Sequence, residues 1–200
     1  YVTQISAGLS IGGVKLIPTF YYGGGGKLVL KTYPWLASAT DGVLAVNDAN
    51  LGVHTLLQPL LYAPALDPAD SRVRAGLAVT MRVLARFRDL CRVSDLRCTV
   101  AIVPSKERVY AEVALAQPSP RHADSLSTLV RNEGAIVDTL TDELEDLRLP
   151  WVDLFPVLKA GVGSGIYQAN RDIHLSERGN ELVAEAIWEH IESRGGVPQR

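Results

Sequence analysis

The residues with the clearest chemical meaning are Asp172 and His174, which stand two positions apart late in the chain. A carboxylate beside an imidazole orients the ring and stabilises the imidazolium that forms when the histidine takes up a proton. The pattern Asp-x-His also occurs on ordinary protein surfaces, where it has no chemical role. The pair is therefore informative only together with the elements that hold it.

A helix is predicted to begin directly after this pair. Ser176 is a favoured N-cap residue, and Glu177 places negative charge at the positive end of the helix dipole. The apolar residues that follow fall on one helical face, with the glutamates largely off it: Leu182, Val183, Ala186, Ile187 and Ile191. A loop held by a docked helix is expected to present an acid–base pair rigidly.

The order and spacing of these residues resemble the end of the SGNH/GDSL hydrolase fold, in which an Asp-x-x-His or Asp-x-His precedes the last helix. The matching positions span about 20 residues: Tyr167, Asp172, His174, Leu175, Gly179, Leu182, Val183, Ala184 and Glu185. The resemblance implies that His174 is the general base and that Asp172 is its partner. A second segment, from Pro104 to Tyr110, resembles the Pro-x-Lys-x-x-x-Tyr pattern of the alginate O-acetyltransferase-like branch of this family.

The resemblance implies an α/β fold with a mainly parallel sheet and helices on both faces, a three-layer sandwich of the SGNH or flavodoxin type. It also implies an ester hydrolase or O-acyltransferase that acts on an acylated carbohydrate or a small ester. Such serine chemistry needs no metal ion and no organic cofactor. The family resemblance favours an extracytoplasmic location, which the composition itself does not settle.

The nucleophile of the family is missing from this chain. Its serine lies in a Gly-Asp-Ser segment near the N-terminal end of the fold, and no Gly-Asp-Ser occurs here. We do not assign that role to Ser10 or Ser105. Two interpretations follow: an enzyme portion whose N-terminal, nucleophile-bearing part is not in this chain, or a catalytically degenerate SGNH-like module that binds a glycan or a protein partner.

Two strands and two long helices are predicted to form the parallel part of the fold. Apolar residues spaced three and four apart predict helices over 71–93 and 123–147. The runs 97–103 and 150–154 predict adjacent parallel strands that are buried on both faces. Ser105 and Lys106 follow the first strand, at the sheet edge where α/β proteins bind ligands, so both are predicted to contact substrate.

The whole chain is predicted to be a single domain, residues 1–200, in which residues 12–70 form an irregular insertion with a β-hairpin. The glycine run 23–26 followed by Lys27 predicts a turn. It is not a phosphate-binding loop, because Leu28 stands where that motif needs Ser or Thr. A short helix is predicted over 50–61, and a short strand over 1–8.

The composition is that of a globular protein, with 47% hydrophobic and 21% charged residues. The net charge of −2 gives no general attraction to nucleic acid. No apolar run approaches the roughly 20 residues that span a bilayer. Cys91 and Cys98 form no metal motif and are predicted to be two small buried residues. The sequence does not set the oligomeric state.

Overall fold

The computed structural model describes residues 42–118, 122–169 and 172–194, together with the backbone of four short strands among the first 41 residues. The chain divides into two compact units, residues 1–42 and 43–200. The strand predicted over residues 1–8 and the glycine run 23–26 lie outside the described residues.

The first unit contains two antiparallel hairpins. Strand β1 (Leu9–Ile11) pairs with β2 (Val14–Leu16), and β3 (Thr19–Tyr22) pairs with β4 (Leu28–Lys31). The β-rich run 14–20 is therefore divided between two sheets.

The second unit opens with another antiparallel hairpin, formed by β5 (Leu44–Asp48) and β6 (Val53–Leu57). Alternate residues of both strands are buried, which is the period-2 pattern of a half-covered strand. The helix predicted over 50–61 is wrong in its first half, because this alternation gives strand up to Leu57. Helix α1 (Pro59–Tyr62) and the 3₁₀ turn η2 (Ala63–Leu66) follow.

The two long helices are found where the apolar spacing predicts them. Helix α2 (Ser71–Val93) is capped by Asp70, whose carboxylate accepts a hydrogen bond from the backbone N–H of Arg72. Helix α4 (Ala123–Asp146) runs through Gly134 without a break. The remaining helices are α3 (Lys106–Leu115), α5 (Phe155–Ala160) and α6 (Glu177–Ser193).

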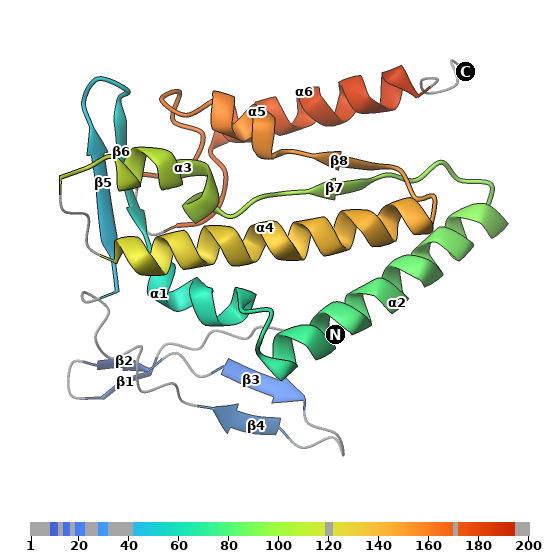
Figure 1. Ribbon diagram of the computed structural model, residues 1–200, viewed down its shortest axis with the longest axis horizontal. Helices are drawn as coiled ribbons and strands as arrows, with labels where there is room; N and C mark the ends of the chain where they lie inside the picture. Colours follow the sequence, from blue (N-terminus) through green and yellow to red (C-terminus); the bar gives the residue numbers. More distant parts are fainter. Residues whose placement is uncertain are drawn as a thin grey trace. The chain divides into compact units, whose positions relative to one another are not determined.

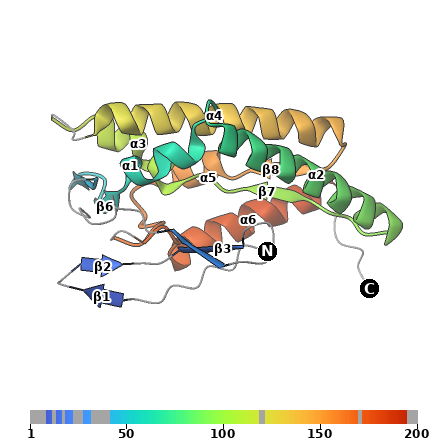
Figure 2. The ribbon, with the colours of Figure 1, turned by 90° about the horizontal axis from the view of Figure 1, so that it is seen from below.

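Strands β7 (Val100–Ile102) and β8 (Trp151–Asp153) form the predicted parallel pair, with Val100 opposite Trp151. The pair lies between α4 and α6 in both views (Figures 1 and 2). Ile102 packs with Leu144 of α4, and Val152 belongs to the apolar cluster that includes the α6 residues. Burial on both faces is wrong for β7, however, because Ala101 and Val103 are exposed.

The described chain is thus an α/β fold with six α-helices and four two-stranded sheets, of which only β7–β8 is parallel. The prediction of a mainly parallel sheet does not hold for these residues, because hairpins supply the other three sheets. No described helix is both long and apolar enough to cross a lipid bilayer.

A disulfide joins Cys91, at the end of α2, to Cys98, just before β7. The prediction of two small buried residues holds for Cys91 but not for Cys98, which is half-buried, and the two sulfurs are bonded to each other. The bond fixes the turn between the helix and the strand, where Asp95 has a positive φ of 52°.

Replacing both cysteines by alanine should lower the free energy of unfolding. Closing a loop of about 8 residues stabilises a protein by about 2–3 kcal/mol in the chain-entropy description. Thermal unfolding should show a lower Tm for Cys91→Ala/Cys98→Ala. Dithiothreitol should lower the Tm of the native chain and leave that of the double variant unchanged; equal Tm values for both proteins without reductant would contradict the prediction.

Candidate functional site

Asp172 and His174 form a hydrogen-bonded pair in the loop before α6. The carboxylate Oδ1 of Asp172 lies 2.5 Å from Nδ1 of His174. The same oxygen accepts a hydrogen bond from the backbone N–H of His174 at 2.8 Å. A carboxylate at Nδ1 favours the tautomer with its proton there, which leaves the lone pair of Nε2 to accept a proton from a hydroxyl or from water.

Both hydrogen bonds hold the pKa of the Asp172 carboxyl below its usual value, with the backbone N–H of His174 contributing most and its ring next. The ionised form of Asp172, which orients the ring, is therefore favoured. The pair is open to solvent, because the His174 side chain is 83% exposed. Simple attraction between exposed charges is weak in water, so the geometry depends on the loop.

The loop is closed by contacts between its two ends. Tyr167 and Leu175 form an isolated antiparallel bridge, and the backbone N–H of Ser176 donates to the carbonyl of Ile166 at 2.9 Å. Ile166 is fully buried, and the Tyr167 hydroxyl donates to the carbonyl of Pro104 at 3.3 Å. The pair therefore lies on a short loop whose base is fixed near the carboxyl end of β7.

Helix α6 is anchored to the same base through Gly179. Ser176 caps the helix, its hydroxyl accepting from the backbone N–H of Gly179 at 3.1 Å. A Cβ at position 179 would lie 2.2 Å from the carbonyl oxygen of Ile166, so only glycine permits this approach. The cap and the helix start agree with the sequence-based prediction.

Lys106 lies at the start of α3 and is only 2% exposed. Its ammonium group donates to the backbone carbonyls of Gln168 at 2.8 Å and of Asp172 at 2.9 Å. Burial lowers the pKa of the Lys106 amine, and the nearby Glu107 and Asp172 carboxylates oppose that effect. The predicted contact of Lys106 with substrate stays a prediction, but in this conformation the ammonium is engaged by the loop.

Ser105 is the N-cap of α3, and its hydroxyl accepts from the backbone N–H of Arg108 at 3.1 Å. The same hydroxyl donates to Oε2 of Glu133, and the backbone N–H of Ser105 donates to Oε1 at 2.9 Å. Both hydrogen-bonding capacities of this serine are thus directed into the protein.

Glu133 is a residue that the sequence reasoning missed. It is 6% exposed and connects α4 to the start of α3. A signal was present, because position 133 falls on the apolar face of its helix between Leu129 and Val137. The role of Gln168 had no such signal, since it acts through its backbone carbonyl.

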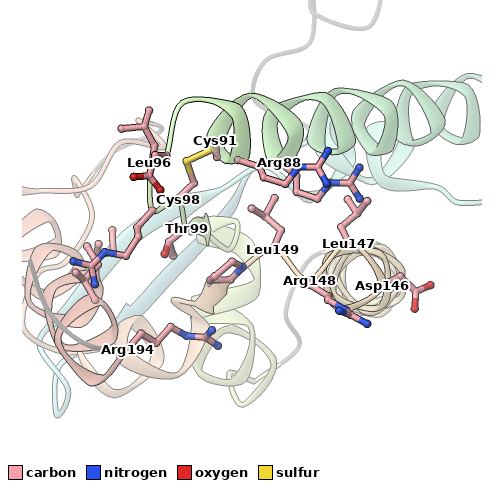
Figure 3. Close-up of a pocket in the computed structure, with 17 residues that line it drawn as sticks. Arg88, Cys91, Leu96, Cys98, Thr99, Asp146, Leu147, Arg148, Leu149 and Arg194 are labelled. Carbon is pink, nitrogen blue, oxygen red and sulfur yellow. A yellow bond between two sulfur atoms is a disulfide. The ribbon is translucent and has the colours of Figure 1, made fainter.

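A hollow of about 1370 Å³ lies away from this loop, at the amino ends of β7 and β8 (Figure 3). The disulfide and the ends of α2, α4 and α6 border it. Its charged lining mixes five arginines with two aspartates: Arg88, Arg92, Arg97, Arg148, Arg194, Asp95 and Asp146. Within the described ranges, no group of three or more His, Cys, Asp or Glu side chains is placed to hold a metal ion.

Residues 61–200 match the family described as "SGNH hydrolase-like domain, acetyltransferase AlgX". The match covers more than half of the 200 residues, including the pair, Lys106 and Ser105. This chain belongs to that family. No curated protein and no solved structure matches it. Membership in this SGNH-like family supports a general esterase or acyltransferase-like function.

Gly179→Ala should destabilise the junction between the loop and α6. The added methyl group overlaps the Ile166 carbonyl, and overpacking of this kind costs about 1–3 kcal/mol. Gly134→Ala is the matched control, because an added Cβ there meets nothing within 4 Å and should raise helix stability by up to about 1 kcal/mol. Chemical denaturation measures both; equal effects of the two substitutions would contradict this packing.

The Asp172 carboxyl should titrate at a lower pKa in the folded chain than in the unfolded chain, because the hydrogen bonds from His174 stabilise its ionised form. The stabilisation is present above the unfolded-state pKa and is lost as the pH falls through the folded-state pKa. The ¹³Cγ resonance of Asp172 reports this titration, with the urea-unfolded chain as reference. His174→Ala should raise the pKa only part of the way, because the backbone N–H at position 174 remains. Identical titration of the folded and unfolded chains would refute this.

Proposed function

We propose that this chain is the His–Asp half of a serine ester hydrolase or O-acyltransferase. The observation that carries the proposal is the 2.5 Å contact between Nδ1 of His174 and the Asp172 carboxylate on a loop fixed at both ends. With Nδ1 occupied, Nε2 accepts a proton from an attacking hydroxyl, and Asp172 stabilises the imidazolium that results.

In this proposal the attacking hydroxyl belongs to a serine that is not in this chain, because no Gly-Asp-Ser segment occurs in it and Ser105 is bound to Glu133 and caps α3. The substrate class is an acylated carbohydrate or a small ester, which rests on the family resemblance. In this acyl chemistry the serine would form the covalent bond to the acyl group, and the His174 imidazole alone would transfer the proton. The pair β7–β8 would be part of the three-layer sandwich of the SGNH fold.

The Cys91–Cys98 disulfide supports an oxidising compartment for this protein, since disulfides persist mainly outside the reducing cytosol. A location outside the cytoplasm agrees with an acylated glycan as substrate.

A second candidate function is a module that binds a glycan or a protein partner without catalysis. The 83% exposure of the His174 side chain favours this alternative, because an open surface is available to a partner while a base normally acts in a site that excludes water.

Hydrolysis of an activated acetyl ester by the natural full-length polypeptide separates the two candidates. His174→Ala should lower kcat/KM by about 10²–10⁴-fold, the usual contribution of a general base. His54→Ala is the matched control: this exposed histidine contacts Asn47 in the β5–β6 hairpin and should leave the rate unchanged.

Labelling by a fluorophosphonate should occur at one serine and should also depend on His174. If His174→Ala keeps both the hydrolysis rate and the labelling of the unsubstituted protein, the enzymatic role of His174 is refuted. A full-length protein that binds glycan but shows no esterase, transferase or labelling activity would establish the binding module.

A further inference from the structure

Lys106 is a buried cation that contacts the loop carrying Asp172 and His174. Neither the family match nor the proposed reaction assigns it a role. Lys106 is 2% exposed, although lysine normally directs its ammonium to water along an extended stem. Burying a charged group is costly unless it is fully hydrogen-bonded. The contacts of this ammonium therefore indicate what its burial achieves.

The two carbonyls that it binds, at 2.8 and 2.9 Å, belong to Gln168 and Asp172 on opposite arms of the loop. Around them, the backbone N–H of Gln168 donates to the carbonyl of His174 at 3.5 Å, and the Thr55 hydroxyl donates to the Gln168 carbonyl at 3.4 Å. Backbone carbonyls that point to the inside of the loop need hydrogen-bond donors, and the ammonium donates one hydrogen bond to each arm. Lys106 thus crosslinks the loop from within.

The cation also acts on the Asp172 carboxylate through its field. Lys106 is among the charges that lower the pKa of Asp172, after the hydrogen bonds from His174. Glu107, itself 2% exposed, neighbours the ammonium and accepts from the backbone N–H of Gln58. Among the described residues, the charged groups that act on this ammonium are therefore Glu107 and Asp172.

We propose that Lys106 is a positioning residue: its ammonium holds the backbone of Asp172 in place, so that the carboxylate stays directed at Nδ1 of His174. This role replaces substrate contact as our assignment for Lys106. It rests on the proposed function only for the catalytic role of the Asp172–His174 pair, because the geometry of the pair is measurable without any substrate.

The test compares neutral and cationic side chains at position 106, and two of the forms are matched to lysine in length. Lys106→Met removes the charge and the donors. Lys106→Cys, alkylated in urea with the native disulfide intact and then refolded, gives two further forms. Bromoethylamine restores an ammonium at the lysine position, and 1-iodopropane adds a neutral group of the same length. Lys159→Met is the control, since Lys159 is an exposed lysine paired with Glu112.

NMR spectra of this chain provide the readouts. In Lys106→Met and in the propylated form, the Asp172 carboxyl should titrate at higher pH than in the native chain, and the His174 Nδ1–H signal should weaken. The aminoethylated form and Lys159→Met should match the native chain. Unchanged Asp172 titration in both neutral forms would overturn the proposal. Loss of the fold in both neutral forms would assign Lys106 to general stability and would overturn it too.

These measurements stand apart from the activity assay, so failure of the esterase proposal leaves them interpretable. If the full-length protein is active, Lys106→Met should lower kcat by about 10²-fold with little change in KM, because it misplaces the base and not the substrate. A raised KM with unchanged kcat would instead return Lys106 to substrate contact.

Discussion

The contact on which the candidate site depends is that between the buried Lys106 ammonium and two backbone carbonyls of the loop. It joins the end of β7, through the first turn of α3, to a segment more than 60 residues later. The Asp172–His174 pair is mostly exposed, so water screens the attraction between its members. The two side chains therefore stay together because the backbone of their loop is fixed, and the buried Lys106 ammonium fixes that backbone.

Two almost fully buried glutamates, Glu133 and Glu107, hold the backbone at and near the start of α3. Glu133 accepts hydrogen bonds from the backbone N–H and the hydroxyl of Ser105, and Glu107 accepts one from the backbone N–H of Gln58. Burial raises the pKa of the Glu107 carboxyl, while the Gln58 N–H and Lys106 oppose this. Removing one member of such a network leaves another charge buried without its partner, which costs more than the net contribution of the intact pair. The start of α3 is thus a rigid platform.

The parallel pair is covered unevenly. Ile102 faces α4 and is buried, whereas Ala101 and Val103 on the opposite face are exposed. The helix α2 likewise leaves Val83, Leu90 and Val93 exposed. Helix α6 covers the β8 side, where it is anchored by Gly179 and the Ile166 carbonyl. The best-packed part of the second unit is therefore the side that carries the loop.

The sequence by itself determined those features whose causes are local. The start of α6 follows from the Ser176 cap, and α2 follows from its Asp70 cap and its apolar spacing. The closeness of Asp172 to His174 is also local, because a carboxylate readily accepts the backbone N–H two residues on. The parallel pairing of β7 with β8 followed from two apolar runs with a helix between them.

Only the tertiary structure decided the features that join distant segments. The direction of the Lys106 side chain depends on where the later loop lies, and the burial of a strand face depends on which helix packs against it. Cys91 and Cys98 form a disulfide because the end of α2 turns back to β7. Periodicity specifies which face of an element is apolar, but the partner that covers that face, or leaves it exposed, is set by the packing of the whole chain.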